Sequence, residues 1–147
     1  MLSYEQALEQ LLAAARPVEE IRRVPITAAA GRVLAQAQVA TVNVPPLDNS
    51  AMDGYAVRLA DVAQAGVTLP VSQRIPAGTV GSELQPGTAA RIFTGAPVPT
   101  GCDAVIMQER CAAGDGVVTL NHVPRAGENI RRCGEDIAPG NEILPAG

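Results

Sequence analysis

The sequence predicts an α+β fold that is mostly β, with an N-terminal helix, a domain of short, twisted strands and a small stalk. Three observations lead to this prediction. Hydrophobic residues make up 47% of the chain but aromatic residues only 2%, so the core must consist of Val, Ile, Leu and Ala. The 14 Gly and 12 Pro residues supply many tight turns. Helical periodicity is strong only in the first segment, and runs with β character fill the remainder.

The predicted helix runs from Ser3 to Ala15. Ser3 followed three residues later by Gln6 matches a capping box, and Glu5 is favourably placed in the first turn. Pro17 is expected to stop the helix. Apolar residues recur at helical spacing and form one stripe: Tyr4, Leu8, Leu11, Leu12 and Ala15. Because the sequence predicts no second strong helix, this stripe has no evident partner within the chain.

The pattern after the helix changes to short strands and turns. A strand is predicted at Ile21–Ile26, a helical turn at Ala28–Gly31, and a further stretch with strand character at Val33–Val44. Gly or Pro separates most of the strands predicted next, which are Gly54–Arg58, Val67–Ile75, Thr88–Phe93, Ala104–Glu109 and Gly116–Leu120.

A hairpin is predicted near the end of this series. Gly114-Asp115-Gly116 is typical of the turn that would join strands at Met107–Cys111 and Val117–Leu120. The last stretch, Ile137–Gly147, repeats the pattern of a short strand and a turn. It stops without a terminal helix or polar tail, from which we expect the chain to be a fragment of a longer protein.

The elements group into three expected parts. Residues 1–22 contain the helix. Residues 46–136 form a β-rich domain. Residues 23–45 and 137–147 come together as the small stalk, because the chain enters and leaves the β-rich domain there.

Composition excludes several classes of function. The formal net charge of −4 does not suit a nucleic-acid-binding surface, which is usually basic. No apolar run approaches the roughly 20 residues of a membrane span, and the N-terminus lacks a secretory pattern, so we expect a cytoplasmic protein. Cys102, Cys111 and Cys133 show no C-x-x-C spacing, which favours reduced thiols over a disulfide framework or a zinc site.

The first segment with candidate chemistry is the Pro-Pro-Leu-Asp-Asn-Ser-Ala-Met-Asp-Gly-Tyr-Ala run at 45–56. Its polar side chains could offer oxygen ligands to a hard cation such as Mg²⁺: Asp48, Asn49, Ser50 and Asp53. The alternative is that the same residues only form turns and caps, because Asp, Asn and Ser bond their own backbone readily.

The second segment is Thr-Gly-Ala-Pro-Val-Pro at 94–99, which follows a predicted strand. Its backbone N–H groups could hold an anion, and Arg91 could serve that anion or pair with a carboxylate. The alternative is a plain surface loop, since two prolines remove two donors.

The third segment, Gly127–Asp136, is the densest cluster of charges. Asp136 is a candidate metal ligand, and Arg131 or Arg132 a candidate anion clamp. In an extended segment Glu135 and Asp136 would point apart, which argues against a hydrolase that uses them as a carboxylate pair. The alternative is a solvated edge or an ion-pair network. His122, the only histidine, is interpreted as structural.

Together the three segments resemble the N-terminal region of the MoeA family of molybdopterin molybdenumtransferases, to which the E domain of gephyrin is related. The resemblance rests on the run at 45–56, on Arg-Ile-Phe-Thr-Gly-Ala-Pro-Val-Pro-Thr-Gly-Cys-Asp-Ala-Val at 91–105, and on Gly-Glu-Asn-Ile-Arg-Arg-Cys-Gly-Glu-Asp at 127–136. It implies insertion of molybdenum from molybdate into adenylylated molybdopterin, with a divalent cation such as Mg²⁺ and release of AMP.

The resemblance also implies which residues matter. Asp53 and Asp136 correspond to functionally important carboxylates and are the implied catalytic residues and metal ligands. Thr94 lies on the family's active-site side. Ser50 and Arg131 are further implied substrate contacts, with Asp48 a weaker addition.

The family's architecture implies that this chain is one wall of a larger site. Its members are elongated homodimers, and a later MogA-like domain, absent here, binds nucleotide and molybdate. The N-terminal helix would pack on that domain, which accounts for the stripe without a partner. We therefore expect the chain to be inactive alone, with a MogA-type protein as a possible partner. The alternative is a gephyrin-like scaffold that binds peptides.

Overall fold

The computed structural model describes residues 2–16 and 18–147, so Pro17, the predicted helix stop, lies outside the described residues. It confirms the mostly β, α+β class, because within that part α1 is the only α-helix and short strands follow it. The chain divides into two compact units, residues 1–37 with 145–147, and residues 38–144.

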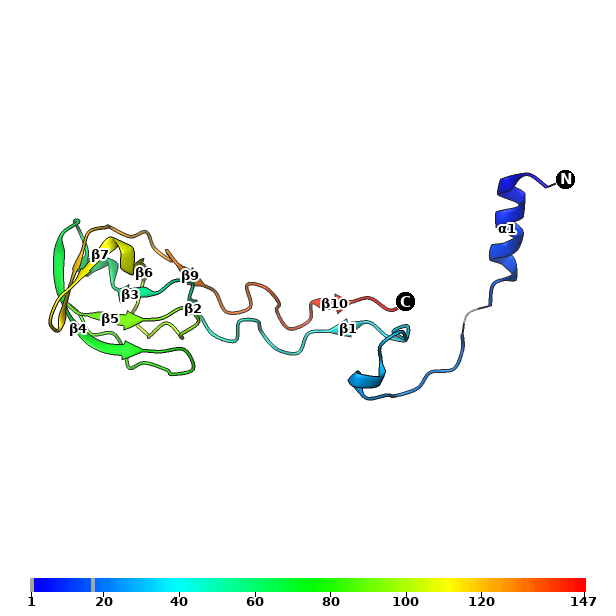
Figure 1. Cartoon of the computed structure of the whole chain (residues 1–147), viewed down its shortest axis with the longest axis horizontal. Helices are drawn as coiled ribbons and strands as arrows, with labels where there is room; N and C mark the ends of the chain where they lie inside the picture. Colours follow the sequence, from blue (N-terminus) through cyan, green and yellow to red (C-terminus); the bar gives the residue numbers. More distant parts are fainter. Residues whose placement is uncertain (1, 17) are drawn as a thin grey trace. The chain divides into compact units, whose positions relative to one another are not determined.

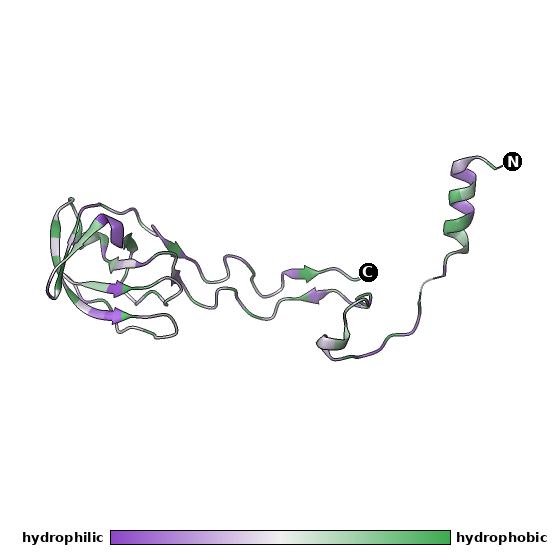
Figure 2. Cartoon of the chain, viewed as in Figure 1, coloured by the Kyte–Doolittle hydropathy of each residue, from purple (hydrophilic) through white to green (hydrophobic). Residues whose placement is uncertain are grey.

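The first unit contains α1, Tyr4–Ala14, and its predicted cap is confirmed. The Gln6 N–H donates to Ser3 Oγ at 3.3 Å, and the Ser3 N–H donates to Gln6 Oε1 at 3.0 Å. No residue of α1 is buried, and the side chain of Tyr4 is 77% exposed. Green and purple bands alternate along the helix in Figure 2. Within its own unit the apolar stripe therefore covers no core.

The strand predicted at Ile21–Ile26 is wrong. Residues 21–25 have no regular structure, and Ile26 begins a short 3₁₀ helix, η1 at Ile26–Ala28. All of Ile21–Ile26 is exposed except the half-buried Val24. A loose alternation of apolar residues becomes a strand only where a neighbouring strand accepts and donates its backbone hydrogen bonds. The strand character at Val33–Val44 likewise reduces to β1, Gln38–Val39, which finds a partner in β10, Glu142–Leu144.

The second unit is built on a six-stranded sheet with the order β6-β3-β5-β4-β8-β7 (Figure 1). The strands are β3 Gly54–Val57, β4 Val67–Ile75, β5 Ala89–Ile92, β6 Ala104–Met107, β7 Cys111–Ala113 and β8 Val117–Leu120. Neighbours run antiparallel except for the parallel pair β4–β5. Two 3₁₀ helices, η2 Leu59–Asp61 and η3 Gln108–Arg110, lie between strands.

The predicted hairpin joins β7 to β8. The Gly114 N–H donates to Val117 O at 2.9 Å, and Gly116 takes a positive φ of 69°, which glycine tolerates without strain. The first strand of the hairpin begins only at Cys111, because η3 interrupts the run predicted from Met107.

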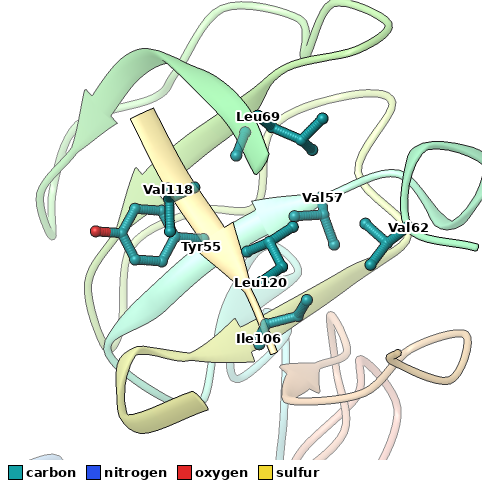
Figure 3. Close-up of a cluster of buried hydrophobic side chains, with 8 residues drawn as sticks. Tyr55, Val57, Val62, Leu69, Ile106, Val118 and Leu120 are labelled. Atoms are coloured by element: carbon teal, nitrogen blue, oxygen red, sulfur yellow. The ribbon is translucent and has the colours of Figure 1, made fainter. Parts of the chain in front are cut away.

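The sheet encloses a core that is nearly free of aromatic residues. Figure 3 shows one of its two clusters, where Val57, Ile106 and Leu120 are fully buried. All four residues of β3 are buried, since this strand lies between β5 and β6. Small residues fill the centre of β5, where Ala89 and Ala90 have no exposed surface.

A two-stranded sheet connects the start of the first motif with the third. β2, Asn49–Ser50, pairs antiparallel with β9, Ile130–Arg131. Asp48 strengthens this junction: its Oδ1 accepts from the Cys133 N–H at 2.8 Å and its Oδ2 from Arg132 Nη1 at 2.6 Å. The carboxylate of Asp48 thus joins segments that lie 84 and 85 residues apart.

Gly54→Ala is expected to destabilise the fold by about 3 kcal/mol or more. A Cβ at Gly54 would lie 2.0 Å from the backbone oxygen of Ile106 in β6, which cannot move without separating β3 from β6. Urea unfolding monitored by circular dichroism measures the loss. Gly114→Ala is the matched control, because its Cβ would meet first a methyl of Val117, 3.0 Å away, which can rotate. Equal losses for the two variants would contradict the prediction.

Asp48→Asn is expected to lower stability at neutral pH but not in acid. The Cys133 N–H, and then Arg132, lower the pKa of Asp48 in the folded protein. The stabilisation is therefore present above the unfolded-state pKa of about 3.9 and is lost as pH falls through the folded value. Unfolding at about pH 7 and about pH 3 should show a difference from wild type that closes in acid. Glu83→Gln, an exposed residue, is the control, and a pH-independent difference for Asp48→Asn would refute the prediction.

Candidate active site

Asp53 and Thr94 meet although they are 41 residues apart. Asp53 precedes β3 and Thr94 lies just beyond β5, and the antiparallel pairing of Gly54 with Ile92 brings the two ends together. Asp53 Oδ1 accepts from the Thr94 N–H at 2.8 Å and from Thr94 Oγ1 at 2.7 Å. These two bonds, with a smaller contribution from Arg91, lower the pKa of Asp53. The site therefore holds an ionised carboxylate at neutral pH.

Arg91 does not pair with a carboxylate among the described residues. Its Nη1 donates to Gly54 O at 2.9 Å and to Ile92 O at 3.3 Å, and its Nη2 donates to Gln108 Oε1 at 2.7 Å. Gln108 was not among the candidate residues of the sequence analysis, yet its N–H also donates to the backbone oxygen of Asp53 at 3.0 Å. Gln108 belongs to no motif, and only the pairing of β3 with β6 brings it to the site.

The 94–99 loop does not offer free backbone donors. The Thr94 N–H is bound to Asp53, the Gly95 N–H donates to Ser50 O at 2.8 Å, and the Ala96 N–H donates to Phe93 O at 2.9 Å. The hypothesis that these N–H groups hold an anion is therefore contradicted, because the protein itself occupies them. Two of these three N–H groups bind the first motif and hold it beside the end of β5.

Ser50 and Asn49 are packed inside the first motif. Ser50 is 1% exposed, and its Oγ donates to Met52 O at 2.5 Å and accepts from the Met52 N–H at 3.3 Å. Its hydroxyl thus shapes the turn that leads to Asp53. Asn49 Oδ1 is buried without a hydrogen-bond partner in the described part of the chain.

Arg131 contacts two of the three acids of the third motif, Glu135 and Asp136. Its Nη2 forms an ion pair with Asp136 Oδ2, and its Nε lies 4.0 Å from Glu135 Oε1. Asp136 raises the pKa of Arg131. The expectation that Glu135 and Asp136 point apart is wrong, because the segment is not extended beyond Arg131. A turn closed by the Glu135 N–H on Arg132 O, with Gly134 at φ 74°, brings both carboxylates back.

An open groove of about 490 Å³ lies beside this ion pair. It is lined by Asp136, Ile137, Asn141, Glu142 and Ile143. The side chains of Arg131 and Asp136 are each nearly half exposed. The third motif thus presents an oriented guanidinium and a carboxylate to solvent.

The two implied catalytic carboxylates belong to separate clusters. Asp53 follows β2 and Asp136 follows β9, and these strands run antiparallel. The two residues therefore lie beyond opposite ends of the β2–β9 pair. Within residues 2–16 and 18–147, no three His, Cys, Asp or Glu side chains gather in a way that could hold a metal ion.

The remaining titratable groups have structural surroundings. His122 Nε2 lies 2.8 Å from Glu128 Oε1. Cys102, Cys111 and Cys133 are free thiols, and burial raises the pKa of Cys102 to about 11. Cys133 Sγ lies 3.1 Å from Pro46 O. None of the helices in the described part of the chain has the length and apolar character needed to span a membrane.

The sequence of this chain is similar to sequences of known proteins over nearly its whole length. Molybdopterin molybdenumtransferase of Haemophilus influenzae is 42% identical over 149 residues, which cover 100% of this chain and 37% of the relative. Molybdopterin molybdenumtransferase 2 of Mycobacterium tuberculosis is 43% identical and is covered over 36% of its length. The chain thus spans little more than a third of these relatives.

A solved structure and a family model cover the same region. The crystal structure of the molybdopterin biosynthesis MoeA protein from Pyrococcus horikoshii superposes with a TM-score of 0.92 at 36% identity, over 100% of this chain and 40% of that one. The model of the MoeA N-terminal region, domains I and II, matches residues 2–147. The chain therefore belongs to the MoeA family, as its N-terminal region.

Proposed function

We propose that the chain is the N-terminal part of an enzyme that inserts molybdenum from molybdate into adenylylated molybdopterin and releases AMP. The observation that carries the proposal is the Asp53–Thr94 pair in a chain of the MoeA family. In this pair an ionised carboxylate lies at the N-terminal end of strand β3. The names of the relatives favour this enzyme over a gephyrin-like scaffold.

Asp53 is the residue that we assign to a divalent cation such as Mg²⁺. Both bonds from Thr94 end on Oδ1, which leaves Oδ2 available for a ligand. Proteins commonly bind Mg²⁺ through one or two carboxylates together with phosphate oxygens of the substrate, so a single carboxylate fits this ion. When bound, the cation would offset negative charge as the adenylate bond breaks.

Asp136 has a separate role in this proposal, because it lies beyond the opposite end of the β2–β9 pair from Asp53. Asp136 lines the groove, and its ion pair orients Arg131 beside it. A guanidinium fixed in this way can bind an anionic group of the substrate through two parallel N–H bonds. Ser50 contributes indirectly, by shaping the turn that presents Asp53.

The larger assembly is also a proposal. We infer a cytoplasmic homodimer in which residues 23–45 and 137–147 form the stalk and residues 46–136 the β-rich domain. The exposed apolar stripe of α1 would pack on a MogA-like domain, and a MogA-type protein is a possible partner. Isolated two-stranded sheets such as β1–β10 are marginally stable, which supports a covering partner there.

Asp53→Asn is expected to reduce turnover by roughly 100-fold or more, because it removes the charged ligand of the proposed cation. The measurement uses a chimera in which this chain replaces the matched region of the Haemophilus influenzae relative. Molybdate-dependent release of AMP from adenylylated molybdopterin is followed with Mg²⁺ present.

Asp136→Asn should also reduce turnover in the same assay, chiefly through a higher KM, because Arg131 loses its orienting partner.

Asp115→Asn, in the exposed hairpin turn, is the control and should leave turnover unchanged. Circular dichroism confirms that each variant is folded. If the folded Asp53→Asn and Asp136→Asn chimeras turn over normally, the site assignment is wrong, and the chain is better interpreted as an assembly or scaffold element.

A further inference from the structure

Arg91 joins three elements of the second unit with one guanidinium. The residue belongs to β5, and it donates to Gly54 O in β3, to Ile92 O in β5 and to Gln108 Oε1 in η3. Two of these acceptors are backbone oxygens, so the contacts fix the path of the chain as well as the side chains.

Each of these acceptors lies next to the Asp53–Thr94 pair. Gly54 follows Asp53 directly, Ile92 precedes Thr94 by two residues, and the Gln108 N–H donates to the backbone oxygen of Asp53 at 3.0 Å. A shift of the guanidinium would therefore be transmitted to both partners of the pair.

Aromatic stacking keeps the guanidinium of Arg91 in place. Its Cζ lies 4.4 Å from the centroid of the Phe93 ring and 5.3 Å from that of Tyr55. A planar, forked donor suits both the stacking and the three acceptors, whereas the point charge of a lysine satisfies neither requirement in full.

We infer that Arg91 is a positioning residue for Asp53 and Thr94, acting through Gly54, Ile92 and Gln108 without contact to the carboxylate itself. The inference rests on the proposed function for its catalytic meaning. Arg91 is thus a further residue of the site besides the two implied catalytic carboxylates. The hydrogen-bond geometry of its guanidinium, more than its charge, sets the orientation of the Asp53 carboxylate.

The chain contains a matched control for this inference. Arg74 in β4 also stacks on Phe93, with its Cζ 4.5 Å from the ring centroid. Its guanidinium forms no hydrogen bond with Gly54, Ile92 or Gln108, which are all described residues. Replacing Arg74 with Lys therefore removes a stacked guanidinium from the same ring, keeps the charge and leaves the three acceptors bound.

The first experiment compares Arg91→Lys and Arg74→Lys in the 147-residue chain by NMR. The Thr94 amide, bonded to a carboxylate, reports directly on the pair, and Asp53→Asn supplies the resonance expected without that charge. Arg91→Lys should move the Thr94 resonance towards that of Asp53→Asn and speed its hydrogen exchange by about 10-fold or more. Arg74→Lys should leave both unchanged.

Gln108→Ala keeps the inference testable if Arg91→Lys does not fold. It removes one acceptor of Arg91 from an exposed 3₁₀ helix, and it should shift the Thr94 amide in the same direction by a smaller amount. An unchanged Thr94 resonance in a folded Arg91→Lys or in Gln108→Ala, or an equal shift in Arg74→Lys, would overturn the inference.

The chimera then gives the catalytic readout. Arg91→Lys should lower kcat by about 10-fold or more with little change in KM, because a misplaced carboxylate affects the reaction more than substrate binding. Equal losses for Arg91→Lys and Arg74→Lys would again count against positioning. An inactive wild-type chimera would refute the proposed function alone, because the NMR comparison tests Arg91 independently of turnover.

Discussion

The structure depends on the close approach of β3 to β6 at Gly54. This residue pairs with Ile92 on one side and with Met107 on the other, and a Cβ would overlap the oxygen of Ile106. Glycine is required here for space, not for an unusual φ. Because β3 pairs with both β5 and β6 at Gly54, the last residues of β5 and β6 lie beside Asp53. The site therefore forms where β3 begins and its two neighbours end.

The first motif uses its two aspartates in the same physical way. Asp48 accepts the N–H of Cys133 and Asp53 accepts the N–H of Thr94, so each carboxylate binds the backbone of a distant segment. In both cases the hydrogen bonds lower the carboxyl pKa and keep the group charged. For Asp53 the interpretation as a cap and the interpretation as a functional group are compatible, because both bonds from Thr94 end on Oδ1 and leave Oδ2 to offer. Asp48 differs, because both of its oxygens accept hydrogen bonds from the third motif.

Local sequence patterns predicted an element well where the residues that begin or end it lie next to it in the sequence. β4 occupies the predicted Val67–Ile75, between Gly66 and Pro76, and the capping box of α1 is present as expected. Predictions failed where the outcome depended on distant partners. Ile21–Ile26 has no strand to pair with, and the acceptors of Arg91 in β3 and η3 lie 37 and 17 residues away along the chain. Such contacts follow from strand register, which short motifs do not contain.

The separation of Asp53 from Asp136 limits what the described residues can do together. The antiparallel β2–β9 pair directs the two carboxylates to opposite ends, and Asp136 is already paired with Arg131. Asp53 thus has one carboxylate oxygen to offer, and within the described residues it belongs to no group of three or more His, Cys, Asp or Glu side chains that could hold a metal ion. A cation bound there would complete its coordination with oxygens other than a carboxylate cluster, such as those of water, substrate, backbone or amide groups. This chain matches only 36–37% of its relatives, which leaves room for the proposal that it forms one wall of a larger site.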